Sequence, residues 1–370
     1  MLRQYKLSDY KFRLVLWIIA LTVLGILIIG SANEGYRSRQ TQGMILGLVA
    51  MLIISLFDYT WVLNFYWLIY LFGSALLLAV LLGGSTSGGA TRWFTIGSFR
   101  FQPSDVVKIM LILFFARFFE THEDTINKWR VILFSVLLIG IQLVMILKEP
   151  DLSTTIVVAL LFCAMIFLAG LSYKIILGIL AVCIPVAILA MSIIMQPDQS
   201  VIPEKYQYQL VRVYAWLRPD EYPDEARQQQ NSIVAIGSGQ LYGKGLDNDD
   251  VSSVKNGNFL SEAQTDFIFA VAGEELGFIG CCLIILLEFL IALECLMIGR
   301  RAKNLSGTLI AGGMAALIFF QSFVNISVTT GILPNTGLTL PFVSYGQTSL
   351  VSFYIGIGFV LNVGLQTRKY

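Results

Sequence analysis

The chain has 370 residues, of which 56% are hydrophobic and 13% charged, and its formal net charge is +1. Soluble domains carry about a quarter charged residues, so this composition indicates a protein that crosses a membrane several times. No basic stripe of the kind that binds nucleic acid is present. The single histidine, His122, and the five cysteines form no CxxC or Cys/His pattern. Histidine triads and zinc sites therefore lack the residues they need.

Ten apolar runs approach the roughly 20 residues that cross a bilayer as a helix. They are residues 14–31, 42–58, 61–82, 105–120, 131–147, 153–170, 174–195, 275–298, 305–327 and 346–366. We therefore predict an all-α polytopic membrane protein with about ten transmembrane helices, forming one integral membrane domain over residues 1–370. One large extracellular loop, residues 196–265, joins the seventh and eighth spans.

The loop itself contains helical patterns. Apolar residues recur at helical spacing in 205–218, which predicts an interfacial helix with Trp216 at headgroup depth. A second short helix is predicted over 226–236. After it, the Gly-rich stretch GSGQLYGKGL is typical of a loop and is not a Walker motif.

Basic residues gather on one side of this layout. They precede the first run, lie in the loop 121–130, follow the eighth span at Arg300 and Arg301, and end the chain. The positive-inside rule then places both termini in the cytoplasm. Segments 32–41, 83–104, 148–152, 196–274 and 328–345 are predicted to be outside.

Asp266 stands where the long polar segment meets an apolar run, in the sequence TDFIFAVAGEELGF. A carboxylate beside apolar material is poorly solvated, so its pKa can rise into the range useful to a general base. Thr265 and Asp266 are also good N-cap residues. A catalytic role and a helix cap are both consistent with this position.

Other charged residues fall at the external ends of predicted spans. Arg92, beside Trp93, could bind a phosphate at headgroup height or belong to an aromatic anchor. Asp105 and Lys108 are three residues apart on one face of the fourth span, where ionisable groups usually pair. Asp151 follows a tight turn and could act in the site or cap the sixth span.

Two further features lie at membrane depth. Glu288 is near the middle of the eighth span, where it is either functional or bonded to Gln321 or Asn325 of the ninth. The uncharged segment 325–350 contains Gly and Pro, which predicts irregular backbone buried within the protein. The external half would hold a mixed set of charges suited to an anionic, lipid-linked substrate, namely Arg92, Asp105, Lys108, Asp151, Arg212, Lys244 and Asp266.

Five stretches carry a specific resemblance: GATRWFTIGSFRFQPSDVVK, KEPDLST, QQNSIVAIGSGQLYGKG, TDFIFAVAGEELGF and LPNTGLTLPFVSYG. In these, and over essentially all ten spans, the chain resembles the SEDS family of bacterial cell-wall proteins, which includes RodA, FtsW and SpoVE. The resemblance implies a peptidoglycan glycosyltransferase that polymerises lipid II, a disaccharide-pentapeptide on undecaprenyl pyrophosphate, at the outer face of the plasma membrane. It also implies a class B penicillin-binding protein as partner.

The resemblance also assigns roles to residues. Asp266 matches the family's essential external Asp, Asp105 and Lys108 match an acidic–Lys pair, Asp151 matches a Pro-Asp-Leu turn, and Arg212 resembles a loop Arg. An α-linked donor and a β-1,4 product imply one inverting displacement, with Asp266 as the base and Arg92, Lys108 and Arg212 on the pyrophosphate. Lys244 is expected on the substrate as well. A divalent cation, Mg or Mn, could neutralise the leaving group, with Asp266 as an alternative ligand for it. No organic cofactor is expected.

Two rival functions are a lipid II flippase and a non-catalytic scaffold for a transpeptidase. Charges gathered at one face and the lack of an inverted repeat argue against a transporter, and tolerance of Asp266→Ala would mark a scaffold. The stretch AIGSGQLYGKG favours the rod-elongation branch, whereas VTTGILPNTG is closer to the division and sporulation branch. We predict the elongation branch.

Overall fold

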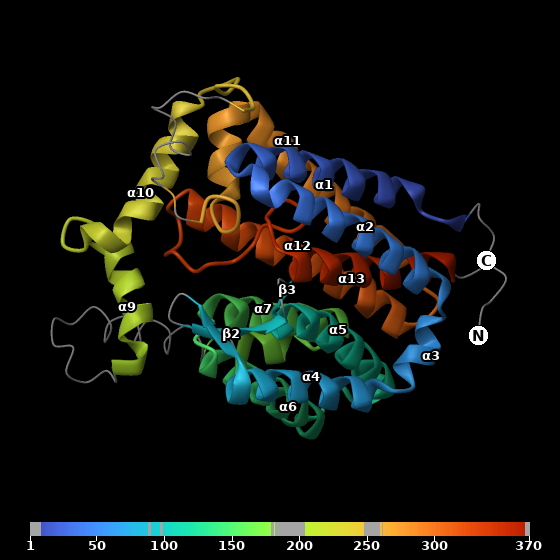
Figure 1. The fold of residues 1–370 in the computed structure, drawn as a ribbon. Coiled ribbons are helices and arrows are strands. Elements are labelled where there is room, and N and C mark those ends of the chain that lie inside the picture. Colours follow the sequence, from blue (N-terminus) through green and yellow to red (C-terminus); the bar gives the residue numbers. More distant parts are fainter. Residues whose placement is uncertain are drawn as a thin grey trace.

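The computed structural model describes residues 9–87, 90–96, 99–178, 181, 204–247, 260 and 262–366. Within this part of the chain, seven helices are long and apolar enough to cross a membrane. They are α1 (Phe12–Ala32), α2 (Glu34–Leu56), α4 (Tyr66–Gly83), α6 (Trp129–Lys148), α11 (Ile268–Arg300), α12 (Leu305–Thr329) and α13 (Gln347–Leu365). Figure 1 shows them packed as one elongated bundle.

Two more helices of the bundle match predicted spans. α7 (Leu152–Leu168) is apolar but has 17 residues, and α5 (Pro103–Thr121) carries several charged residues. Nine of the ten predicted spans thus coincide with helices in the described residues, and most of the remaining run, 174–195, lies outside them. The predicted all-α polytopic membrane fold is confirmed.

One predicted boundary is wrong. The segment 32–41, predicted to be an external loop, is mostly helix, because α2 begins at Glu34. The Asn33 side chain accepts a hydrogen bond of 3.0 Å from the Gly35 amide, as an N-cap does. The first turns of α2 expose charged residues, Glu34 and Arg37 among them. An apolar pattern could not reveal this extension, because these turns are polar.

The bundle has two halves, which the short helix α3 (Tyr59–Leu63) connects (Figure 1). One half contains α1, α2, α11, α12 and α13, and the other contains α4 to α7. α12 packs against both α5 and α7 and so joins the halves. Its Gly312 and Gly313 lie against Leu168 and Ile112, where a Cβ would come within 3.0 Å of either side chain. Small residues allow this close helix contact.

A small antiparallel sheet, which the sequence did not predict, precedes α5. Its strands are β1 (Ser85–Ser87), β2 (Ala90–Ile96) and β3 (Phe99–Phe101), in the order β1-β2-β3. Ser85 pairs with Trp93, and Phe94 pairs with Phe101. The sheet fixes Arg92 in the middle of β2, close to the start of α5.

Two helices of the large loop lie across one end of the bundle (Figure 1). Both were predicted, and they form as α9 (Glu204–Leu217) and α10 (Pro223–Ser238). The Trp216 indole N–H donates to the Gly331 carbonyl at 2.7 Å, so Trp216 contacts the protein. Gln229 and Ser232 of α10 donate to the Val328 and Thr329 carbonyls, each at 2.8 Å. These bonds fasten the α9–α10 pair to the end of α12.

Between α12 and α13 the backbone is irregular and buried, as predicted. Leu340, Phe342 and Val343 are at most 2% exposed. The Gln40 amide donates to the Ser344 carbonyl, and the Gln321 amide donates to the Thr339 carbonyl, both at 2.9 Å. Neighbouring helices therefore satisfy backbone groups that this segment cannot pair internally.

The start of α1 and the end of α13 lie at one end of the bundle, opposite α9 and α10 (Figure 1). A Cβ at Gly364 would lie 3.3 Å from the Lys11 side chain. Near the same end, the Arg13 guanidinium forms an ion pair with Glu294 of α11. The positions of the two ends agree with the even number of spans predicted.

Candidate functional site

Asp266 lies in the turn that leads into α11, and its main chain is held firmly. Three consecutive carbonyls accept hydrogen bonds from the segment that follows α12 or from α12 itself. The donors are the Tyr345 amide to Gln264 at 2.9 Å, the Ser344 hydroxyl to Thr265 at 2.7 Å, and the Asn325 amide to Asp266 at 2.9 Å. Each such bond stabilises the fold by about 1 kcal/mol, so together they fix the position of the Asp266 backbone.

The Asp266 side chain does not act as a helix cap. The N-cap of α11 is Phe267, and no side chain caps that end of the helix. The interpretation of Thr265 and Asp266 as caps is therefore wrong. A Cβ at Gly337 would lie 3.1 Å from the Asp266 carboxylate, and Gly337 has a φ of 74°. Glycine here both permits the turn and leaves room beside the carboxylate.

Burial raises the pKa of the Asp266 carboxyl to about 6, with a further upward contribution from Glu262. Arg212 and Arg92 lower it, and Asp151 raises it slightly. These interactions show that Asp266 shares an electrostatic environment with three other predicted site residues. With this pKa, Asp266 is mainly ionised at pH 7 and accepts a proton more readily than an ordinary carboxylate.

Arg92 is held by the turn between α6 and α7. Its Nε donates to the Glu149 carbonyl at 3.1 Å, and its Nη2 donates to the Pro150 carbonyl. Its Nη1 lies 3.7 Å from the Asp151 carboxylate, a loose ion pair. Asp151 also accepts a hydrogen bond of 3.0 Å from the Thr154 amide, which caps α7. The structure thus brings Arg92 and Asp151 together and confirms Asp151 as a cap.

Arg92 and Arg212 line one small cleft. Its other walls are Pro150, Leu152, Ser153, Val213, Pro334, Asn335 and Thr336. Arg212 projects from α9 and donates to the Asn335 carbonyl at 3.4 Å. The cavity measures about 20 Å³, which is enough for about one water molecule. A diphosphate is larger than this cavity, so its entry between the two arginines would require the walls of the cleft to move apart.

Asp105 and Lys108 form the predicted pair, but they lie deeper than the cleft wall. Lys108 Nζ is 2.8 Å from the Asp105 carboxylate and donates to Gln321 at 2.9 Å. Lys108 is 1% and Asp105 7% exposed. Because Gln321 also donates to Thr339, the pair connects α5 with the irregular segment. In this conformation the Asp105–Lys108 pair does not line the cleft; it stabilises the packing of α5 against α12 and the irregular segment.

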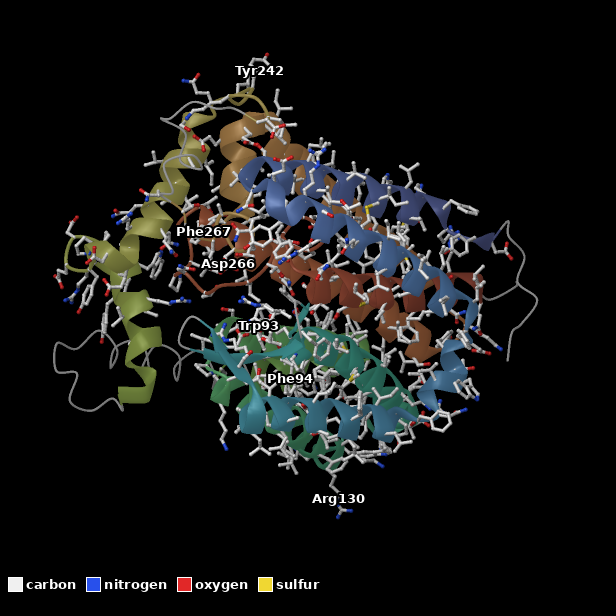
Figure 2. The ribbon with its side chains drawn as sticks, viewed as in Figure 1. Trp93, Phe94, Arg130, Tyr242, Asp266 and Phe267 are labelled. Carbon is white, nitrogen blue, oxygen red and sulfur yellow. The ribbon has the colours of Figure 1, made fainter. Side chains whose placement is uncertain are left out.

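Lys244 is not brought together with these residues. Its Nζ is 2.8 Å from Glu274 of α11, and its amide donates to the Glu274 carbonyl at 2.9 Å. Figure 2 shows Tyr242, two residues earlier, at the top of the molecule, well away from Asp266. The cleft is lined without Lys244. Its ion pair holds the Gly-rich turn after α10 on the first turns of α11.

Two buried acidic residues lie outside the cleft: one was predicted to bond α12, and the other was not predicted to have a role. Glu288 is buried, and its oxygens bond neither Gln321 nor Asn325 within the described structure, so these two predicted partners are wrong. Glu149, at the end of α6, was not singled out by sequence. It is fully buried, and both of its carboxylate oxygens lack a hydrogen-bond partner in the described part of the chain.

The sequence matches the FtsW/RodA/SpoVE family of cell cycle proteins over residues 10–369. The peptidoglycan glycosyltransferase MrdB of Escherichia coli K12 is 34% identical over 356 residues, covering 95% of this chain and 92% of the relative. A probable peptidoglycan glycosyltransferase FtsW of Coxiella burnetii is 33% identical and covers 98% of each chain.

Solved structures give the same result. A chain of a peptidoglycan synthase complex that coordinates polymerization and crosslinking superposes with a TM-score of 0.77, at 28% identity, covering 96% of this chain and 97% of the other. The rod shape determining protein RodA of Thermus thermophilus gives a TM-score of 0.70 at 26% identity, covering 98% of each. The chain therefore belongs to the FtsW/RodA/SpoVE family.

Proposed function

We propose that this protein is a peptidoglycan glycosyltransferase that polymerises lipid II into β-1,4 glycan strands. The observation that carries the proposal is Asp266, a fixed, partly buried carboxylate with a pKa raised to about 6, which is coupled electrostatically to Arg92 and Arg212, the two arginines of the cleft. A proton acceptor that interacts electrostatically with two guanidinium groups suits transfer of a sugar from a diphosphate. The relatives named above carry the same activity in their names.

In this mechanism Asp266 removes the proton from the 4-hydroxyl of the acceptor sugar as that oxygen attacks the anomeric carbon of the donor. The bond from that carbon to the pyrophosphate oxygen breaks at the same time, so configuration inverts in one displacement. The anchored backbone of Asp266 keeps the carboxylate in place for this step. The reaction leaves the proton on Asp266 and both electrons of the broken bond on the pyrophosphate.

Arg92 and Arg212 contact the pyrophosphate in this proposal. Guanidinium groups bind phosphate through paired, charge-assisted hydrogen bonds and stabilise the negative charge that builds up on the leaving group. Arg92 is held by two carbonyls and a loosely placed carboxylate. It can exchange the Asp151 contact for a phosphate oxygen while the carbonyls still hold it.

We also propose that a divalent cation, Mg²⁺ or Mn²⁺, binds with the substrate. Among the described residues, no group of three or more His, Cys, Asp or Glu side chains could hold a metal ion. Mg²⁺ is often bound by only one or two carboxylates together with substrate phosphates. An ion here would therefore be held mainly by the diphosphate, and none of the steps above is assigned to it.

The location and partner follow from the same proposal. The protein spans the bacterial plasma membrane with both termini in the cytoplasm and the cleft on the outer side. The chain ends lie at the end of the bundle opposite α9 (Figure 1), and Arg212 of α9 lines the cleft, which supports this orientation. A class B penicillin-binding protein is the proposed partner, by analogy with the synthase complex of similar structure. Rod elongation is the proposed process.

Asp266→Asn tests the function directly. The protein is purified with its transpeptidase, given lipid II in detergent, and glycan length is read on a gel. The wild type should produce polymer, and the variant should lose at least about 100-fold in rate, because it lacks the base. Gel filtration and membrane level serve as folding controls.

Other outcomes separate the rivals. Polymer from Asp266→Asn at the wild-type rate would exclude Asp266 as the base. If neither protein makes polymer but the wild type translocates lipid II in vesicles, the protein is a flippase. If it does neither yet restores the activity of its transpeptidase, it is a scaffold.

A further inference from the structure

Glu149 is a buried acid that the mechanism above does not use. Glu149 is the C-cap residue of α6 and is 0% exposed. Neither of its carboxylate oxygens has a hydrogen-bond partner in the described structure. An ionised carboxylate without partners is costly to bury, whereas a neutral acid costs far less. The arrangement around the side chain therefore favours the protonated form.

Glu149 lies next to the groups that hold Arg92, so its protonation state affects Arg92. Its own carbonyl binds Arg92 Nε at 3.1 Å, and the next carbonyl, that of Pro150, binds Arg92 Nη2. Asp151, two residues on, supplies the carboxylate 3.7 Å from the same guanidinium. The turn of Glu149, Pro150 and Asp151 thus determines how much negative charge surrounds Arg92.

We infer that Glu149 is a positioning residue for Arg92. When Glu149 is neutral, Arg92 can bind the pyrophosphate of the donor; when Glu149 is ionised, its charge attracts Arg92 and weakens that binding. This inference rests on the proposed function. With Glu149 neutral, the turn places one carboxylate, that of Asp151, against Arg92. With Glu149 ionised, the turn adds a second negative charge that attracts this guanidinium and opposes its contact with the substrate.

Among the described residues, the charged groups around this turn include Asp266, which is coupled electrostatically to Asp151 and Arg92. Asp151 raises and Arg92 lowers the pKa of Glu149, and burial is the largest cause of its rise to about 8. Arg212 faces the turn across the cleft from α9, and Lys148 is exposed to solvent. The facing segment contributes Pro334, Asn335 and Thr336, which carry no charge. The wild type should therefore be active near pH 7 and lose activity as Glu149 ionises above pH 8.

Glu149→Gln tests the inference, because glutamine has the shape of the neutral acid and cannot ionise. At pH 9 about 90% of Glu149 is ionised if its pKa is about 8. Wild-type polymerisation should fall about tenfold between pH 7 and pH 9, whereas Glu149→Gln should keep its rate. Glu123→Gln, which changes an exposed acid in the loop after α5, should follow the wild type.

Binding of inorganic pyrophosphate, measured by calorimetry at pH 7 and pH 9, is a readout independent of catalysis. Wild-type affinity should weaken about tenfold relative to that of Glu149→Gln over this range. If Glu149→Gln does not fold, Glu149→Met provides a second side chain that cannot ionise.

Parallel pH profiles for the wild type and the Glu149 variants, in rate and in binding, would overturn the inference and leave the proposed function intact. Pyrophosphate binding that depends on Glu149 without any polymer would instead support the inference about Arg92 and count against the glycosyltransferase.

Discussion

Asp266 should set the acid limit of the reaction. Its pKa is about 6, mainly because it is buried, and only the ionised form accepts a proton. As pH falls through 6 the base is lost, so the rate at pH 5 should be about one tenth of that at pH 8 in Glu149→Gln, which removes the alkaline limit.

Glu262, four residues before Asp266, provides a test that the acid limit belongs to Asp266. Glu262 raises the pKa of Asp266, so Glu262→Gln should move the acid limit to lower pH. Initial rates from pH 4.5 to 8 would measure both. An unchanged limit in Glu262→Gln would show that another group titrates.

Lys108→Ala should damage the protein more than Asp151→Ala. Removing Lys108 leaves Asp105 buried without its ion pair, a loss of about 3–5 kcal/mol for a buried pair. Asp151→Ala removes the cap on Thr154, worth about 1 kcal/mol, while two carbonyls still hold Arg92.

Apparent melting temperatures in detergent would compare these variants. The double variant Asp105→Asn/Lys108→Met should melt above Lys108→Ala, since it leaves no unpaired charge. Equal and mild effects of Lys108→Ala and Asp151→Ala would contradict this account.

Sequence reasoning identified most of these residues but could not describe their surroundings. Asp105 and Lys108 were predictable as a pair because helical spacing determines which residues are neighbours. The contact of Arg92 with Asp151 joins segments about 60 residues apart, which no local pattern encodes. Glu149 was missed because a glutamate before Pro-Asp looks like an ordinary loop residue; only its burial distinguishes it.

At the scale of elements, the turn after α10 depends on a close contact between backbones. A Cβ at Gly239 would lie 1.9 Å from the Gly273 carbonyl, whereas a Cβ at Gly237 meets nothing within 4 Å. Gly239→Ala should therefore separate α10 from α11 and lower the melting temperature by several degrees. Gly237→Ala, in the exposed last turn of α10, should be neutral or stabilise by up to about 1 kcal/mol. Equal melting temperatures for the two variants would exclude this close packing.

The elements that sequence predicted best were those with a strong period or an unbroken apolar run. The spacing of apolar residues predicted α9, and long apolar runs predicted the spans. Charged first turns concealed the start of α2. The strands β1 to β3 are short and lie in a Gly- and Ser-rich stretch, so their pairing depends on neighbours that sequence does not reveal.

For the whole molecule, the proposed orientation makes opposite predictions for the two ends of the bundle. Tyr242 is 78% exposed near α10, and Arg301 is exposed in the turn after α11. In a background without the five native cysteines, Tyr242→Cys should react with a membrane-impermeant maleimide on intact cells. Arg301→Cys should react only after the cells are opened. The reverse pattern would place the cleft in the cytoplasm.

The hydrogen bond from Trp216 to the Gly331 carbonyl also allows movement of α9 to be detected by the intrinsic fluorescence of Trp216. Trp216 is on α9, the helix that carries Arg212 to the cleft, and outward movement of α9 would widen the cleft for a diphosphate. When α9 lifts, the indole exchanges a protein carbonyl for water, and its fluorescence emission shifts to longer wavelength. Opening of the cleft can therefore be followed in real time with an unlabelled substrate, once the other tryptophans are replaced by phenylalanine.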